Sequence, residues 1–179
     1  VFDGDYNNLN NKPTLHNHTG SRSDEFVANT DGNNTASGAR SMAGGHQNEA
    51  NASYAYAMGG YYNRAHAIYA TIIGGVRNYA TGDNSTILNG MDNYARSFCE
   101  TVLGYYNTDY TPNKTGNIDP NDRLFVIGNG TGTSARSNAL VMLKNGNTTL
   151  NGELTINNGT GTEYTLPADN GADGQVLST

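Results

Sequence analysis

The sequence from residue 44 to residue 103 divides into equal segments: GGHQNEANASYAYAM (44–58), GGYYNRAHAIYATII (59–73), GGVRNYATGDNSTIL (74–88) and NGMDNYARSFCETVL (89–103). Each segment has 15 residues and opens on a glycine pair or, in the last case, on Asn-Gly. An apolar couple precedes each pair, an asparagine lies three residues after it, and an alanine lies two residues further on. Such self-similarity is typical of stacked-repeat proteins, in which one repeat cannot bury its apolar side alone.

The composition favours an all-β, turn-rich protein. The 179 residues include 23 glycines, and asparagine is more frequent still. Both residue types adopt the positive φ angles that tight turns require. Only 15% of the residues are charged, which argues against intrinsic disorder, and no stretch shows a sustained helical period with caps.

Charge and cysteine content exclude several classes of function. The net charge is −6 with only 10 Lys and Arg, which provides no basic surface for nucleic acid or an anionic membrane. No apolar run is long enough to span a bilayer, so we expect no membrane insertion by this fragment, which begins at Val1. The single Cys99 excludes an intrachain disulfide, and we expect it to be a small buried residue.

The patterns divide the chain into regions. Residues 1–25 form an Asn-rich lead-in that is too polar for its own core, and residues 26–107 carry the repeats. Residues 108–122 contain two prolines and no apolar pattern, so we expect an inserted loop. Residues 123–179 contain apolar runs and Asn-Gly pairs, which predict a β-rich neck with hairpins.

Within each repeat, two short extended pieces should alternate with two turns, giving a parallel β-roll, or solenoid. Stacked strands lie about 4.8 Å apart, so each turn lengthens the roll by only that amount. Each turn contributes few apolar side chains, several of them alanine, and a single chain should leave much of them uncovered. Because oligomers of one chain close by symmetry, we expect a homo-oligomer.

The repeat N-x-A-x-G-x-x-S-x-φ-φ-G-G, where φ is an apolar residue, is visible as NTASGARSMAGG and NYATGDNSTILNG. It resembles the head repeats of trimeric autotransporter adhesins and haemagglutinins. The lead-in FDGDYNNLNNKPTL is similar to linkers of phage tail fibres and bacterial surface fibres. The segment from Arg123 to Ile156, followed by YTLPADNGADGQVLST (164–179), is similar to the neck that follows such heads.

The resemblance implies a left-handed β-roll completed as a homotrimer, in an extracellular location on a bacterial cell surface or on the tail fibre of a virion or injection system. It implies a fibre head that mediates adhesion or recognises a cell-surface receptor, for which a glycan is the expected ligand. A passive structural spacer within a tail fibre is the alternative.

Tyrosines are the candidate binding residues. The chain has 12, and equivalent positions in successive turns predict ladders that pair Tyr54 with Tyr69, Tyr79 with Tyr94, and Tyr61 with Tyr106. Aromatic side chains in an Asn-rich surface can also stack on sugar rings. The doublets next to turns are therefore the predicted ligand contacts: Tyr61, Tyr62, Tyr105 and Tyr106.

His16 and His18 form a candidate metal site. Residues i and i+2 of an extended chain face the same side, and three such pairs around a trimer axis would offer six imidazoles to a transition-metal ion. Solvation in a polar lead-in is the alternative. We expect His46 and His66 to be surface residues. Three acidic residues of the inserted loop could supply oxygen ligands to calcium, although their spacing matches neither an EF-hand nor a nonapeptide calcium repeat and a solvated loop is the alternative: Asp109, Asp119 and Asp122.

No catalytic constellation stands out in the sequence. The residues Glu49, Glu100, Glu153 and Glu163 are scattered, and no base is placed beside Cys99 or a serine. The GNGTGT segment follows a predicted strand but precedes no predicted helix, so it is not a phosphate-binding loop. We therefore expect a non-catalytic protein.

Overall fold

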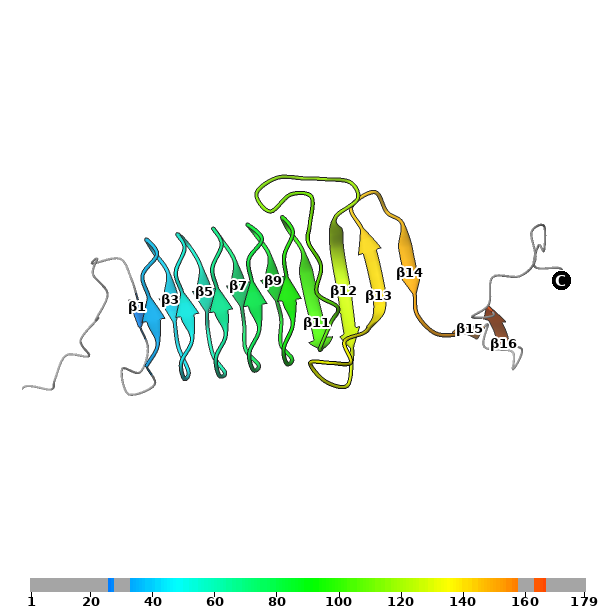
Figure 1. Cartoon of the computed structure of the whole chain (residues 1–179), viewed down its shortest axis with the longest axis horizontal. Helices are drawn as coiled ribbons and strands as arrows, with labels where there is room; N and C mark the ends of the chain where they lie inside the picture. Colours follow the sequence, from blue (N-terminus) through cyan, green and yellow to red (C-terminus); the bar gives the residue numbers. More distant parts are fainter. Residues whose placement is uncertain (1–25, 28–32, 158–162, 167–179) are drawn as a thin grey trace, which may run out of the picture.

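The computed structural model describes residues 26–27, 33–157 and 163–166, and throughout these ranges the chain forms strands and turns without a helix. Successive turns of the roll stack side by side, as Figure 1 shows. Each turn contributes one short strand to each of two parallel ladders. One ladder contains β2 (Thr35–Ala36), β4 (Glu49–Ala50), β6 (Arg64–Ala65), β8 (Tyr79–Ala80) and β10 (Tyr94–Ala95).

The other ladder begins a nine-stranded sheet. Its parallel part contains β1 (Phe26–Val27), β3 (Met42–Ala43), β5 (Tyr56–Ala57), β7 (Thr71–Ile72), β9 (Thr86–Ile87) and β11 (Thr101–Tyr105). Three further strands complete it: β12 (Arg123–Asn129), β13 (Asn138–Leu143) and β14 (Thr148–Leu150). We call this the long sheet, and the five-stranded ladder the short sheet.

The strand register repeats the sequence period, which confirms the stacked parallel roll. In the short sheet Ala65 pairs with Ala80, and in the long sheet Ile72 pairs with Ile87. Most equivalent residues are 15 apart, as between Asn63 and Asn78. The spacing falls to 14 between Asn93 and Asn107, because the last turn is one residue shorter.

Small inward-facing side chains fill the interior of the roll. The inner residues of both ladders are fully buried, including Ala57, Ala65, Ile72, Ala80 and Ile87. We expected one chain to leave much of its apolar interior uncovered. The structure shows instead that the roll is narrow enough for alanine to close its centre within one chain.

A line of buried asparagines runs through this interior. The side-chain oxygen of Asn48 accepts the backbone N–H of Asn63, that of Asn63 accepts from Asn78, and that of Asn78 accepts from Asn93. The amide nitrogens of Asn48, Asn63 and Asn78 also donate to glycine carbonyls, and Asn63 Nδ2 contacts the carbonyl oxygens of Gly59 and Gly75, both at 2.9 Å. The asparagine line, which also includes Asn107, thus satisfies backbone groups that the turns would otherwise leave buried and unpaired.

The second glycine of each pair makes room for this line. Gly60 and Gly75 have φ angles of 82° and 91°, which L side chains rarely adopt. A Cβ atom on Gly60 would lie 2.1 Å from the carbonyl oxygen of Gly75 and 2.8 Å from Asn63 Nδ2. The recurring Gly-Gly and Asn are therefore parts of one packing unit.

Two further rows of turn residues have left-handed backbone angles although they are not glycine. They are Arg40, Tyr54, Tyr69, Asn84 and Cys99 in one row, and Gln47, Tyr62, Arg77, Asp92 and Tyr106 in the other. Cys99 has a φ of 55° and is only half-buried, so the expectation that it is a small buried residue is wrong.

Beyond the roll, the chain continues the long sheet. After residues 108–122, β12 pairs in parallel with β11, and β13 and β14 add antiparallel neighbours. Gly146, with φ 89°, lies in the turn between β13 and β14. A separate antiparallel pair joins β15 (Leu154–Asn157) to β16 (Glu163–Leu166).

Candidate functional site

The outer face of the long sheet carries a row of large apolar side chains. Because side chains alternate along a strand, the residues that flank the buried Ala57, Ile72 and Ile87 point away from the interior. The register of the sheet places the outward residues side by side from β5 to β14. This outer apolar row consists of Met58, Ile73, Leu88, Leu103, Ile127, Leu140 and Leu150.

Several members of this row are widely exposed in a single chain. The exposed fraction is 50% for Met58, 49% for Ile73, 42% for Leu88 and 45% for Leu150. Soluble monomers rarely expose contiguous apolar surface of this kind, and such patches mark interaction sites. The outer apolar row is therefore the main candidate for contact with another protein surface.

The predicted tyrosine ladders are present within the roll. The rings of Tyr54 and Tyr69 are stacked with centroids 4.7 Å apart, and those of Tyr79 and Tyr94 lie 5.3 Å apart. The third pairing was wrong by one residue. Tyr105, not Tyr106, is equivalent to Tyr61, because both belong to a line of backbone bridges that runs through Val76 and Met91.

The four tyrosines predicted to contact a ligand lie beside the glycine corners. Tyr61 and Tyr105 are exposed, by 39% and 52%, whereas Tyr62 and Tyr106 are half-buried. The rings of Tyr61 and Tyr62 contact each other edge to face at 4.4 Å. Along the chain, Tyr61 lies three residues after Met58 and Tyr105 lies two residues after Leu103, and Met58 and Leu103 both belong to the outer apolar row.

The outer face of the short sheet has a different character. Its outward residues are polar or aromatic, and its charges are paired: Arg64 Nε donates to Glu49 Oε1 at 3.2 Å, and His66 Nε2 lies 2.9 Å from Glu49 Oε2. One residue beyond each strand, equivalent positions form a second line, which we call the polar row. It consists of Ser37, Asn51, His66, Thr81 and Arg96.

The inserted loop of residues 108–122 folds back on the end of this face. The backbone N–H of Asp83 donates to the carbonyl of Thr115 at 2.8 Å, and that of Phe98 donates to the carbonyl of Lys114 at 3.3 Å. The buried carboxylate of Asp122 accepts the backbone N–H groups of Asn113 and Lys114 at 2.7 and 2.8 Å. The loop is therefore anchored at both sides of its bend.

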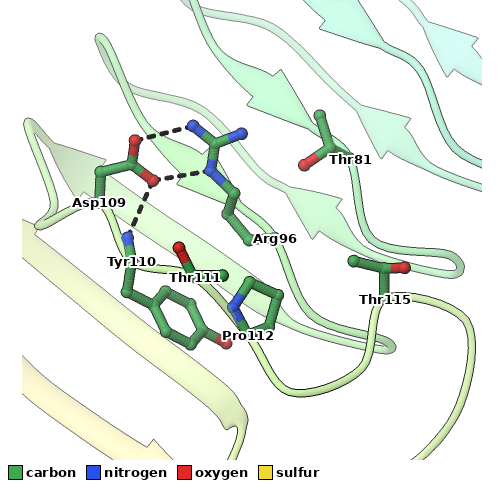
Figure 2. A pocket seen from close by; sticks show the side chains of 7 residues that line it. All are labelled: Thr81, Arg96, Asp109, Tyr110, Thr111, Pro112 and Thr115. Carbon is green, nitrogen blue, oxygen red and sulfur yellow. Dashed lines mark hydrogen bonds and ion pairs between the residues drawn. The ribbon is translucent and has the colours of Figure 1, made fainter.

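Between loop and roll lies an open pocket of about 560 Å³, shown in Figure 2. The roll contributes Thr81 and Arg96, which are the last two members of the polar row. The loop contributes the remaining lining residues: Asp109, Tyr110, Thr111, Pro112 and Thr115. The volume lies within the ordinary range of small-molecule sites.

Arg96 and Asp109 form a two-pronged ion pair in the wall of the pocket. Arg96 Nε and Nη2 each donate to one oxygen of the carboxylate at 2.7 Å. Partial burial raises the pKa of Asp109, but the hydrogen bonds and charge of Arg96 outweigh it and bring the pKa below its ordinary value. The pair is thus fully ionised near neutral pH and has no net charge.

Aromatic contacts fix the position of the pair and of the adjacent loop. The Arg96 guanidinium lies 4.5 Å from the ring centroid of Tyr94, which Arg136 contacts at 4.6 Å. The Tyr110 ring lies 4.0 Å from the Arg123 guanidinium. Burial, together with the nearby negative charge of Glu100, raises the pKa of Tyr110 to about 12, so its hydroxyl keeps its proton.

A buried carboxyl group lies behind this wall. Glu100 Oε2 accepts the backbone N–H groups of Arg96 and Ser97 at 2.8 and 2.9 Å, while Oε1 has no hydrogen-bond partner. Burial raises the pKa of Glu100, although the two backbone hydrogen bonds and the charges of Arg123 and Lys144 act against the rise. Glu100 thus supports the backbone from which Arg96 projects.

The structure accounts for the other predicted candidates as follows. His46 and His66 are exposed, as expected. Each of the three loop aspartates is engaged by the protein itself, Asp109 with Arg96, Asp119 with Asn113 and Asn121, and Asp122 with the loop backbone. His16 and His18 lie outside the described residues, and within those residues no group of three or more His, Cys, Asp or Glu side chains is arranged to hold a metal ion.

Searches with family models, curated proteins and solved structures gave no match to this chain. In the described ranges, no helix has the length and apolar character of a bilayer span. The two outer faces of the roll and the pocket are therefore its candidate functional surfaces.

Sequence reasoning missed the pocket and the outer apolar row. The apolar couples contained a signal for the row, because the first residue of Ile72-Ile73 faces inward and the second therefore faces outward. No comparable signal paired Arg96 with Asp109, since their contact depends on how an irregular loop folds back.

Proposed function

We propose that this chain forms the head of an extracellular homotrimeric fibre, a left-handed β-roll that adheres to a cell surface by recognising a glycan receptor. The outer apolar row on the long sheet carries this proposal. It is the surface that partner copies cover, and the trimeric number comes from the resemblance to adhesin heads. The protein acts by binding and not by catalysis.

Burial of the outer apolar row supplies the free energy of assembly. Full burial of one large aliphatic side chain contributes roughly 1.5–3 kcal/mol. The row extends over neighbouring strands from β5 to β14, so copies aligned along the same axis cover it continuously. Tyr61 and Tyr105, which follow members of the row along the chain, extend the contact around the corner. Three heads on one fibre then convert weak individual binding into firm attachment.

The experiment for assembly compares two variants by sedimentation or light scattering. Leu88→Asp places a charge in the centre of the outer apolar row and should convert trimers to monomers. Asn51→Asp places the same charge on the exposed short-sheet face and should leave the trimer intact. A wild-type chain that is monomeric at micromolar concentrations, or a trimer that Leu88→Asp leaves unchanged, contradicts the proposal.

A passive spacer in a tail fibre is the second candidate. The uninterrupted ladder from β1 to β14 favours it, because stacked turns cover each other's strand edges and make a stiff rod. Binding of fluorescently labelled trimers to candidate host cells separates the two. Saturable binding supports the adhesive head, whereas an intact trimer that binds no host cell supports the spacer.

A further inference from the structure

The geometry points to the pocket between the inserted loop and the short sheet as a site for a neutral saccharide, with further sugar units lying along the polar row. This inference rests on the proposed glycan-binding function and assigns it to residues other than the tyrosine doublets. The pocket residues and their orientation can be followed in Figure 2.

The electrostatics of the pocket select an uncharged ligand. Asp109 already compensates the positive charge of Arg96, so a carboxylate or phosphate would gain little from the guanidinium and would be repelled by Asp109. The net charge of −6 also opposes a polyanionic ligand. On the face leading to the pocket, Glu49 and Arg64 are also paired, through one contact at 3.2 Å.

Donors and acceptors lie close together in the pocket, as neighbouring sugar hydroxyls require. The Arg96 guanidinium carries five N–H donors, and its two bonds to Asp109 occupy two of them. The carboxylate oxygens of Asp109 can also accept further hydrogen bonds. One sugar hydroxyl can therefore accept from Arg96 while donating to Asp109. Thr81, Thr111 and Thr115, each with a hydroxyl group, also line the pocket.

An apolar wall completes the site. Pro112 and the half-buried ring of Tyr110 line the pocket beside these polar groups. A pyranose ring presents C–H groups on its faces and hydroxyls at its edge. The apolar wall suits the C–H groups, and the polar lining residues suit the hydroxyls. The anchored loop and the Tyr94 contact hold Arg96 in place before binding, which reduces the ordering cost.

The polar row extends the site along the roll. Thr81 and Arg96 belong both to the pocket lining and to this row, and His66, Asn51 and Ser37 continue it at one residue per turn. Adjacent members interact: Ser37 Oγ donates to Asn51 Oδ1 at 3.1 Å, and Asn51 Nδ2 lies 3.3 Å from His66 Nε2. The spacing of about 4.8 Å between turns is close to the length that one sugar unit adds to an extended chain.

The test uses the intact trimer on an array that carries neutral glucan, mannan and N-acetylhexosamine oligosaccharides beside sialylated and sulfated glycans. We expect binding to a neutral class, stronger for a hexasaccharide than for the matching disaccharide. Arg96→Ala and Thr111→Ala should each weaken that binding, the former by about tenfold or more because it removes charged hydrogen-bond donors. Tyr69→Ala removes an exposed aromatic ring outside both the pocket and the outer apolar row, so it is the matched control and should leave binding unchanged.

Each variant is first checked for an unchanged melting temperature and trimeric mass, and Thr111→Ala serves as the milder probe if Arg96→Ala loosens the loop. The inference is overturned if the wild type binds no neutral glycan, if it binds charged glycans alone, or if both pocket variants bind as the wild type does. Host-cell binding that survives Arg96→Ala and Thr111→Ala would leave adhesion standing and reject only this pocket. Pocket-dependent binding to the array without binding to host cells would support the saccharide pocket and reject adhesion to those cells.

Discussion

The side-chain oxygen of Asn63 accepts the backbone N–H of Asn78, which lies one complete turn further along the roll, at 3.0 Å. Asn78 repeats the contact with Asn93 at the same distance. These buried amides therefore connect successive turns through the interior, in addition to the two strand ladders on the outside. A side chain usually assigned to exposed turns here acts as a structural element of the core.

Replacement of Asn78 by alanine should strongly destabilise the roll. The change removes hydrogen bonds to the carbonyl oxygens of Gly74 and Gly90 and leaves the N–H of Asn93 unpaired. We expect a loss of roughly 3 kcal/mol or more in the free energy of unfolding. Asn51→Ala on the surface is the control and should cost about 0.5 kcal/mol or less. If chemical denaturation gave equal losses of unfolding free energy for Asn78→Ala and Asn51→Ala, the asparagine line would not stabilise the roll more than a surface asparagine does.

The two glycines of one pair should differ sharply in their tolerance of a side chain. Gly75→Ala places Cβ 2.1 Å from the carbonyl oxygen of Gly90 at a φ of 91°, so we expect a loss of about 2 kcal/mol or more. At the neighbouring Gly74 the nearest atom to an added Cβ is 3.9 Å away, and the equivalent position naturally holds Asn89. Gly74→Ala should be neutral. Similar melting temperatures for both variants would contradict this account.

Glu100 should make the stability of the roll depend on pH. Because its pKa is raised above the ordinary 4.5 in the folded chain, the folded state binds this proton more tightly than the unfolded state does. Its stabilising effect is present below pH 4.5 and is lost as pH rises through the higher folded-state pKa. Glu100→Gln keeps a carbonyl oxygen for the N–H groups of Arg96 and Ser97 without acquiring a charge.

We therefore expect Glu100→Gln to be more stable than the wild type at pH 8, by on the order of 1–3 kcal/mol, with the difference shrinking toward pH 4. Thermal melts of both proteins across this pH range measure the effect. Because the two proteins differ only at residue 100, the contributions of all other titrating groups cancel in the difference between them. A constant difference at every pH would show that Glu100 does not titrate as the structure requires.

Ser85 and Ser41 occupy equivalent positions but should respond in opposite ways to alanine. The hydroxyl of Ser85 is buried and has no partner, whereas that of Ser41 donates to the carbonyl of Gly38 at 2.7 Å. Ser85→Ala should stabilise the protein by up to about 1 kcal/mol, since Ala55 and Ala70 already fill the same position in other turns. Ser41→Ala should destabilise it by a similar amount. Denaturation midpoints of the two variants on the same side of the wild type would refute the comparison.

The repeat allowed much of the fold to be predicted. The 15-residue spacing of Gly45, Gly60 and Gly75 sets the length of a turn, and the recurrent alanines define the inner face. The burial of Asn63 and Asn78 was not predicted, because an asparagine that serves a turn and one that serves the core have the same spacing. Only the packing of its amide against a glycine without Cβ distinguishes them.

The functional surfaces were less predictable, for two physical reasons. The shorter last turn shifts equivalence by one residue, so a fixed period aligned Tyr61 with Tyr106 where the backbone pairs the line of Tyr61 with Tyr105. The pocket depends on a loop without periodicity. In this loop Asp122 accepts the backbone N–H of Asn113, and Asp109 accepts from Arg96 of the roll. The repeat supplies Thr81 and Arg96, but local contacts of the loop bring the other lining residues against them.

The asparagine line also sets a rule for how such a molecule changes in size. A cut or duplication that spans one full 15-residue module joins an amide to an identical neighbour and preserves every internal bond, and the 14-residue turn that ends at Asn107 keeps the same bond with one residue fewer. The length of the roll along its axis therefore changes in steps of about 4.8 Å, one for each added or removed turn. Duplication or deletion of 15 codons in the earlier turns would therefore lengthen or shorten the roll and leave the pocket beside the inserted loop unchanged.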